Sequence, residues 1–181
     1  MGLNPHRDRL CLVQISAGDD ICHMVQFPLE NGQVRYEAPN LGRLLTNTAV
    51  TKIFHFGRFD IAMLYRHLGV VCEPVYCTKI ASKLVRTYTD RHGLKDLCRD
   101  LLSIELSKEQ QTTDWGAATL SPEQLNYAAR DVLYLHRLRS CLNGLLERED
   151  RTELAQACFE FLPARAKLDV AGWNEIDIFA H

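Results

Sequence analysis

Two short segments of the sequence place carboxylates where a metal-dependent reaction could use them. Asp60 closes the segment KIFHFGRFD, residues 52–60, which is typical of a β-strand that leads into the first turn of a helix. Carboxylates beyond the end of a strand are well placed for a binding site in α/β proteins. The alternative is a local role, in which Asp60 complements the helix dipole and contributes about 0.3–1 kcal/mol.

The second segment is Tyr127–Asp131, with the sequence YAARD. Tyr127 and Asp131 are four residues apart on a predicted helix and therefore share one face. A phenol beside a carboxylate could hold a water molecule next to a bound cation. Asp131 lies within an apolar helix, where an idle carboxylate is uncommon. The alternative is a surface Asp and a half-buried Tyr without a catalytic role.

A group of basic residues follows the first segment: Lys79, Lys83, Arg86, Arg91 and Lys95. The first three have the i, i+4, i+7 spacing of one helix face. This pattern predicts a stripe that positions phosphates beside the site. A solvated helix face without a ligand is an equally good interpretation.

The elements that would position these residues alternate between strands and helices in the first half of the chain. Strands are predicted at residues 9–16 and 21–27, joined by a turn at 18–20, and at 51–56. Short helices are predicted at 41–45 and 59–67, the second ended by Gly69. This alternation indicates an α/β fold.

From about Thr78 the chain is predicted to be mainly helical. Ser121 starts a helix with Pro122 at its first position and Gln124 placed for a capping box. This helix is expected to run through residues 125–146 with a break near Gly144. A further helix over 151–161 is expected to end at Pro163. We expect one domain, because no linker or low-complexity segment interrupts the chain.

Composition excludes several classes of protein. The 181 residues carry 21 Lys plus Arg against 23 Asp plus Glu, so the chain is slightly acidic and any nucleic-acid contact must be local. No apolar run is long enough for a membrane helix, and the N-terminus does not resemble a signal peptide. The seven cysteines contain no C-x-x-C pair, which argues against zinc and favours reduced thiols in the cytoplasm.

The two carboxylate segments resemble known motifs. H-x-x-x-F-D at His55–Asp60 and Y-x-x-x-D at Tyr127–Asp131 are similar to the second and third motifs of the DEDD exonucleases. The tyrosine marks the DEDDy subgroup, which includes ribonuclease D. GLNPHRDRLCLVQIS, CTKIASKLVRTYTDRHGLK and GWNEIDIFAH resemble the compact nano-RNase C family, so the similarity covers essentially the whole chain.

This resemblance implies a ribonuclease H-like fold, a mixed sheet flanked by helices, in one domain over residues 1–181. It also implies a metal-dependent 3′→5′ exoribonuclease that hydrolyses short RNA, above all dinucleotides, to 5′-mononucleotides, and a homo-octamer. Two Mg²⁺ or Mn²⁺ ions would be bound by Asp60 and Asp131.

The resemblance further implies roles for side chains around these ions. Tyr127 would orient the attacking water, His55 and Phe59 would shape the floor of the pocket, and Leu3 would wedge against the terminal bases. The basic stripe, with Lys83, Arg86 and Arg91, would hold the phosphates of the substrate.

One departure from the family pattern affects the chemistry. The family's first motif, Asp-x-Glu, belongs on a strand just upstream of the segment that matches Gly2-Leu3, and this sequence contains no such motif there. Asp60 and Asp131 alone provide few oxygen ligands for two hard cations. We therefore expect the missing carboxylates, and the first strand of the sheet, to precede Met1 in a longer protein.

Three alternatives remain open at this point. The chain could trim the 3′ ends of longer RNA, as ribonuclease D does. It could be a non-catalytic RNA-binding or assembly protein, because the first carboxylate motif is absent. A DNA exonuclease would share the same motifs, because nothing in the sequence identifies a group that reads the 2′-hydroxyl.

Overall fold

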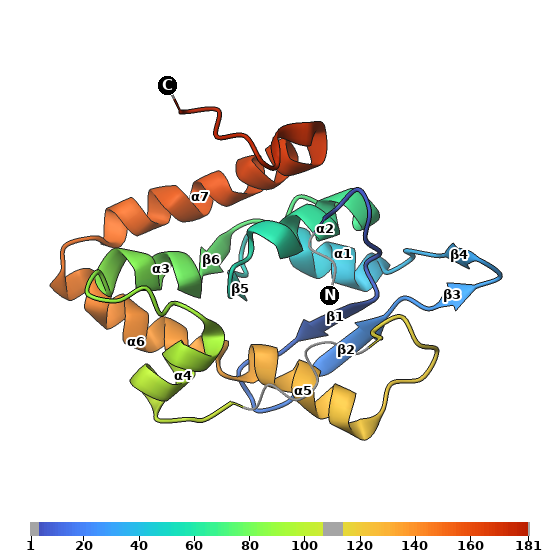
Figure 1. Ribbon diagram of the computed structural model, residues 1–181, viewed down its shortest axis with the longest axis horizontal. Coiled ribbons are helices and arrows are strands. Elements are labelled where there is room, and N and C mark those ends of the chain that lie inside the picture. Colours follow the sequence, from blue (N-terminus) through green and yellow to red (C-terminus); the bar gives the residue numbers. More distant parts are fainter. Residues whose placement is uncertain (1–3, 107–113, 181) are drawn as a thin grey trace.

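The computed structural model describes residues 4–106 and 114–180, in which short strands precede a mainly helical second half (Figure 1). The strands are β1 (Leu12–Ile15), β2 (His23–Gln26), β3 (Leu29–Glu30), β4 (Gln33–Val34), β5 (Lys52–Phe54) and β6 (Val75–Cys77). The helices are α1 (Pro39–Thr46), α2 (Arg58–Leu68), α3 (Thr78–Val85), α4 (Leu94–Leu102), α5 (Pro122–Leu133), α6 (Leu135–Arg148) and α7 (Thr152–Leu168), followed by the π-helical turn η1 (Asp169–Trp173).

β1 and β2 form the antiparallel hairpin that the sequence predicts, with Leu12 opposite Gln26 and Ile15 opposite His23. The turn needs a positive φ at Gly18, where φ is 85°. A Cβ at Gly18 would also lie 2.9 Å from the imidazole of His136 on α6, so the glycine lets the hairpin approach that helix. The small β3–β4 hairpin was not predicted, because its strands are two residues long and mostly exposed.

β5, α2 and β6 form a parallel strand–helix–strand unit, in which Lys52 pairs with Val75 and Phe54 with Cys77. The strand and helix predicted at 51–56 and 59–67 are confirmed, as is the end of α2 at Gly69, where φ is 68°. Among the described residues the β1–β2 and β5–β6 pairs remain separate two-stranded sheets.

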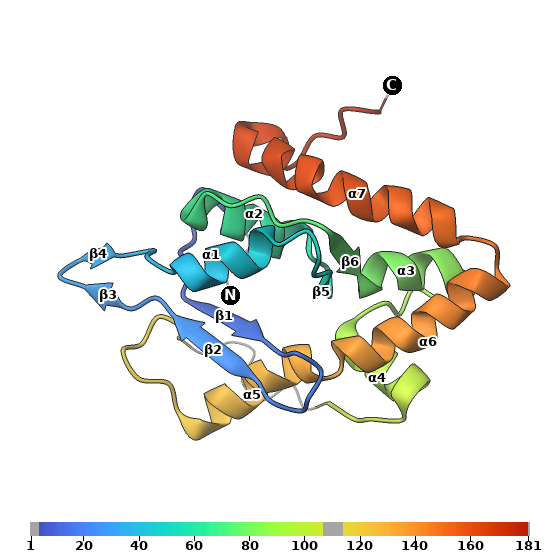
Figure 2. The ribbon, with the colours of Figure 1, turned by 180° about the vertical axis from the view of Figure 1, so that it is seen from behind.

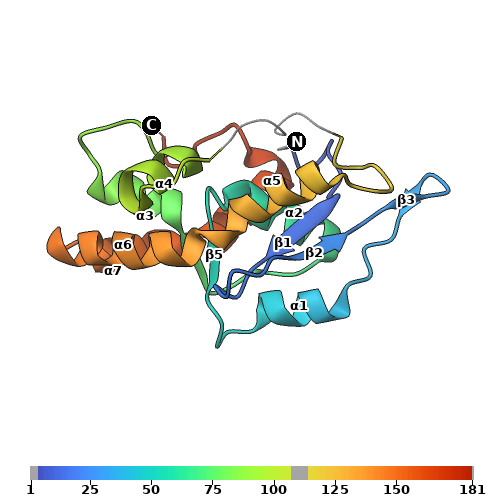
Figure 3. The same cartoon turned by 90° about the horizontal axis from the view of Figure 1, so that it is seen from below.

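The long helix predicted at 125–146 is broken at Tyr134, and the expected break near Gly144 is wrong. α5 and α6 need different directions because they pack on different partners. α5 lies across β1, whereas α6 contacts α3 and α4 (Figure 3). The buried stripe of α6 continues past Gly144 through Leu138, Leu142 and Leu146, so the helix has no reason to end there.

α7 continues through Pro163, so the predicted end of that helix is also wrong. Pro163 is buried, and α7 packs along α2 (Figure 2). Tertiary packing outweighs the backbone hydrogen bond that a proline removes.

The hydrophobic core is formed mainly between α2, α3, α4, α6, α7 and the β5–β6 pair, and includes Ile61, Leu97, Leu138 and Leu142. All seven cysteines are free thiols, and Cys72, Cys77 and Cys98 are buried. No helix within residues 4–106 and 114–180 is long and apolar enough to cross a membrane.

Candidate active site

Asp60 is the third residue of α2, directly after the tight connection from β5. Gly57 makes this connection possible, because a Cβ there would lie 2.6 Å from Cβ of Phe54. The first residue of α2 is fixed from the other side. Arg58 donates two hydrogen bonds of 2.7 Å to the carboxylate of Asp169 and one of 2.6 Å to the carbonyl oxygen of Asn174. The start of the helix turn that carries Asp60 is therefore held by close packing at Gly57 and by the hydrogen bonds of Arg58.

Tyr127 and Asp131 lie on α5, as the sequence predicts. The helix begins with the predicted capping box: Ser121 Oγ accepts from the N–H of Gln124, and the Gln124 side chain accepts from the N–H of Ser121. The indole of Trp115 packs near the ring of Tyr127, with 6.0 Å between ring centroids. Capping and this aromatic contact fix the helix face that presents the phenol and the carboxylate.

The two carboxylates influence each other electrostatically. Asp60 as a whole residue is exposed, but the protein atoms around its carboxylate desolvate the charged form. This desolvation raises the pKa of Asp60 to about 7, and repulsion from Asp131 is the second cause. Burial raises the pKa of Asp131 to about 6. Burial, followed by the charge of Asp131, also raises the pKa of Tyr127. The structure thus brings together the three residues that the sequence singled out on two distant segments.

This pair of like charges fits a hard cation. Neither Asp60 nor Asp131 forms an ion pair with a Lys or Arg in the described part of the chain. Carboxylate oxygens are the ligands that Mg²⁺ and Mn²⁺ prefer. Within residues 4–106 and 114–180, no cluster of three or more His, Cys, Asp or Glu side chains could hold a metal ion.

His55 lies at the carboxyl end of β5 and is fixed by a hydrogen-bond chain. The hydroxyl of Thr78 donates to the carbonyl oxygen of Phe54 at 3.2 Å, so it accepts from His55 Nδ1 at 2.9 Å. Burial, and then the charge of Lys79, lower the pKa of His55 to about 4. The imidazole is therefore neutral near pH 7, and Nε2 is left as an acceptor.

An aromatic and cationic contact beside His55 was not predicted. Phe56 is 41% exposed and has a φ of 63°, which is unusual for this residue type. The ammonium of Lys79 lies 3.5 Å from the centroid of the Phe56 ring, and Phe59 packs edge-on against that ring at 5.0 Å. Lys79 follows β6 by two residues, and only the fold places it against Phe56.

The basic stripe does not form a single face. Lys83 and Arg91 are exposed, whereas Arg86 is 2% exposed, forms an ion pair with Asp100 and donates to the carbonyl oxygen of Arg91. α3 ends at Val85, so the helical spacing that the prediction used stops before Arg86. Leu3, the predicted wedge, lies outside the described residues.

Comparison with known proteins reveals several relatives. The chain is 34% identical to ribonuclease D of Jannaschia sp. over 155 residues, which is 82% of this chain and 39% of that protein. It therefore spans about two fifths of the length of this curated relative. Among solved structures, NrnC of Brucella melitensis with bound Mg²⁺ has a TM-score of 0.93 and 57% identity, and the match covers 99% of this chain and 86% of that one. The same protein bound to pGG has a TM-score of 0.93, 59% identity, and coverage of 99% and 85%.

A sequence model for a 3′-5′ exonuclease family matches residues 1–147. This match covers more than half of the sequence, so the chain belongs to the 3′-5′ exonuclease family. Within that family its similarity extends to NrnC over nearly the whole sequence, as the resemblance of the motifs predicts. The predicted ribonuclease H-like α/β fold is confirmed.

Proposed function

We propose that this chain is the catalytic domain of a metal-dependent 3′→5′ exoribonuclease that converts short RNA, above all dinucleotides, to 5′-mononucleotides. The observation that carries the proposal is the convergence of Asp60, Asp131 and Tyr127 from segments about seventy residues apart. The dinucleotide preference is supported by the high identity to a protein that has been solved bound to pGG.

Asp60 and Asp131 would hold divalent ions, Mg²⁺ or Mn²⁺, two in number. Such ions, when bound, lower the pKa of the attacking water and stabilise the oxygen that leaves. Tyr127 lies one helix turn from Asp131 and orients this water. The water oxygen forms a bond to phosphorus, and the bond from phosphorus to the 3′-oxygen of the preceding nucleotide breaks. The products are a 5′-mononucleotide and a shortened RNA with a free 3′-hydroxyl.

The other predicted contacts surround this reaction. His55 and Phe59 would form the floor of the pocket, and Leu3 would wedge against the terminal bases. Lys83 and Arg91 are exposed and would bind phosphates directly. Arg86 is buried, so its contribution would come through the carbonyl oxygen of Arg91, which it holds in place.

Two carboxylates are too few for two hard cations, which require several oxygen ligands each. We propose that a further strand, carrying Asp-x-Glu, joins the separate β1–β2 and β5–β6 sheets and completes the site. The intact mass of the protein from its native source tests this. A mass above the 20.7 kDa of this sequence supports it. An equal mass favours the alternative of a non-catalytic RNA-binding or assembly protein.

We also propose a cytoplasmic homo-oligomer, an octamer by family resemblance. The described residues after α7 expose a group of large apolar side chains: Trp173, Ile176, Ile178 and Phe179. Exposed apolar surface of this kind is typical of a subunit contact. The free thiols are consistent with a reducing compartment.

Substitution of Asp131 by Asn tests the catalytic assignment. We expect loss of a ligand charge to reduce turnover of pGG by about a thousandfold, corresponding to ~4 kcal/mol of transition-state stabilisation. The thermal unfolding midpoint should change little, because the substitution removes only a buried charge that repels Asp60. Glu123→Gln, an exposed acid on the same helix, is the matched control. Near-normal turnover of Asp131→Asn would contradict the proposal.

The substrate class requires a separate comparison. Hydrolysis rates should be measured with pGG, with longer RNA and with the matching deoxyribo-oligomers, at equal concentration and in Mg²⁺. We expect the highest kcat/KM for the diribonucleotide. A higher value for longer RNA would favour trimming of the ribonuclease D type, and a higher value for the deoxyribo-oligomers would favour a DNA exonuclease.

A further inference from the structure

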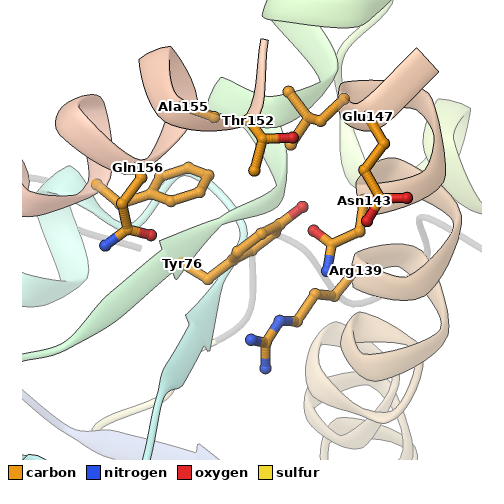
Figure 4. A pocket seen from close by; sticks show the side chains of 9 residues that line it. Tyr76, Arg139, Asn143, Glu147, Thr152, Ala155 and Gln156 are labelled. Atoms are coloured by element: carbon orange, nitrogen blue, oxygen red, sulfur yellow. The ribbon is translucent and has the colours of Figure 1, made fainter. Parts of the chain in front are cut away.

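A cavity of about 160 Å³ lies where β6, α6 and α7 meet, and it shares no residue with the carboxylate pair. Figure 4 shows Tyr76 rising from β6, while Arg139, Asn143 and Glu147 follow successive turns of α6. We call this cavity the α6–α7 pocket; its remaining lining residues are Leu146, Thr152, Ala155, Gln156 and Phe159.

The Tyr76 side chain carries a hydroxyl that has no partner among the described residues. Tyr76 is 5% exposed, and its oxygen is buried and points between Thr152 and Asn143 (Figure 4). A buried polar group left without a hydrogen bond costs about 1–3 kcal/mol. Burial also raises the pKa of Tyr76, so the group stays a protonated donor. The phenol is therefore a donor that faces the cavity without an acceptor.

Arg139 adds an uncompensated positive charge to the same pocket. Its guanidinium lies 5.3 Å from the centroid of the Tyr76 ring. Nε is buried without a hydrogen-bond partner, and no carboxylate of the described chain forms an ion pair with this side chain. By contrast, Arg58, Arg86 and Arg165 are all paired with aspartates.

The surroundings of the pocket favour an anion at its inner end. Thr152 is the first residue of the 17-residue helix α7, whose N-terminus carries partial positive charge. Glu147 is exposed at the rim, two helix turns from Arg139, and would repel an anion there. An anion is therefore expected next to the Tyr76 hydroxyl and Asn143, away from Glu147, with the positive charge of Arg139 beside the Tyr76 ring.

We propose that the α6–α7 pocket binds phosphate, either as the free ion or as the terminal group of a small phosphate ester. The Tyr76 hydroxyl on β6 and the Asn143 amide on α6 offer donors, and the charge of Arg139 favours an anion such as phosphate. The cavity is several times the ~30 Å³ that a water molecule occupies. Leu146 and Phe159 provide an apolar wall for the carbon part of an ester. The proposal does not depend on the nuclease activity.

Thermal unfolding of the full chain in EDTA tests the proposal, because chelation removes metal ions that could hold phosphate at the carboxylate pair. Inorganic phosphate and ribose 5-phosphate are titrated separately, with chloride at matched ionic strength as the reference. We expect Tm to rise with the logarithm of ligand concentration above Kd. The probe that acts at the lower concentration identifies the free ion or the ester as the ligand.

Variants distinguish this site from others. Arg139→Gln should weaken the apparent affinity at least about tenfold, because the positive charge of the pocket is lost. Tyr76→Phe keeps the ring on Phe159 and should also reduce the shift. Arg137→Gln, an exposed position on α6, should retain it. The proposal is wrong if phosphate and ribose 5-phosphate shift Tm no more than chloride does, or if the shift persists in Arg139→Gln. It is also wrong if Tyr76→Phe only raises the basal Tm, as it would when the hydroxyl is simply unsatisfied.

Discussion

Individual side chains at the site perform separable tasks, which their environments determine. Asp60 and Asp131 repel each other and have no basic partner among the described residues, so a cation is the natural counter-charge. Tyr127 lies on the same face of α5 as Asp131, and its ring packs near the indole of Trp115. In the function we propose, the carboxylates bind the ions and the phenol positions the water.

Substitution of Tyr127 by Phe separates these tasks. The ring and its contact with Trp115 remain, while the hydroxyl that would orient water is lost. We expect kcat to fall about 10²–10⁴-fold, with KM for pGG nearly unchanged. Steady-state kinetics at saturating Mg²⁺ measures both constants. A change confined to KM would show that Tyr127 contacts the substrate instead of the water.

The sequence predicts Asp60, Tyr127 and Asp131 as site residues because their positions, after a strand end and on one helix face, follow from neighbouring residues. It did not reach the contact between Lys79 and Phe56, which depends on how β5 and β6 pair. It also overlooked the burial of Arg86, because a helical spacing does not reveal where the helix ends. Residue type and spacing identify candidates, whereas burial and pairing come only from the tertiary structure.

At the scale of elements, the connection between β5 and α2 positions Asp60 through close packing. Gly57 lies so near Phe54 that an added methyl group must displace backbone or ring. We expect Gly57→Ala to lower the free energy of unfolding by about 1–3 kcal/mol through overpacking. Thermal or urea unfolding measures this change.

Gly144→Ala is a matched control for that substitution. Gly144 lies within α6, and a Cβ there would meet nothing within 4 Å. Alanine has the higher helix propensity, so we expect stability to rise by up to about 1 kcal/mol. Equal destabilisation by both substitutions would contradict the packing argument.

The pair of Arg58 and Asp169 links α2 to η1. Asp169 is 2% exposed and also forms an ion pair with Arg165 at 3.0 Å, so one buried carboxylate serves two guanidinium groups. We expect Asp169→Asn to reduce the free energy of unfolding by about 3 kcal/mol, because buried charge is left unpaired. Asp96→Asn, which breaks a more exposed pair with Arg99, should cost no more than about 1 kcal/mol. Similar losses for both variants would show that Asp169 has no special role.

Elements with strong local signals were predicted correctly, and those determined by packing were not. The capping box at Ser121 and the end of α2 at Gly69 depend on neighbouring residues, and both are confirmed. The break at Tyr134 and the passage of α7 through Pro163 depend on the partners against which these helices pack. A local rule for glycine or proline cannot include those partners.

On the scale of the whole molecule, the exposed apolar residues after α7 indicate an interface. We predict that the chain assembles in solution and that Ile176→Asp combined with Phe179→Ser shifts it to smaller species. Light scattering coupled to size exclusion measures the mass. Leu154→Ser, at an exposed position near the other end of α7, should leave the assembly unchanged. A monomeric unmodified chain would contradict this prediction.

The link between Arg58 and Asp169 has a consequence for synthesis of the protein on the ribosome. These two residues are 111 positions apart in sequence. The turn of α2 that carries Asp60 leaves the exit tunnel long before the aspartate that fixes it has been translated. If the proposed function holds, we therefore expect the nascent chain to lack the Arg58–Asp169 link while ribosomal and messenger RNA surround it, and the nuclease to mature only late in translation.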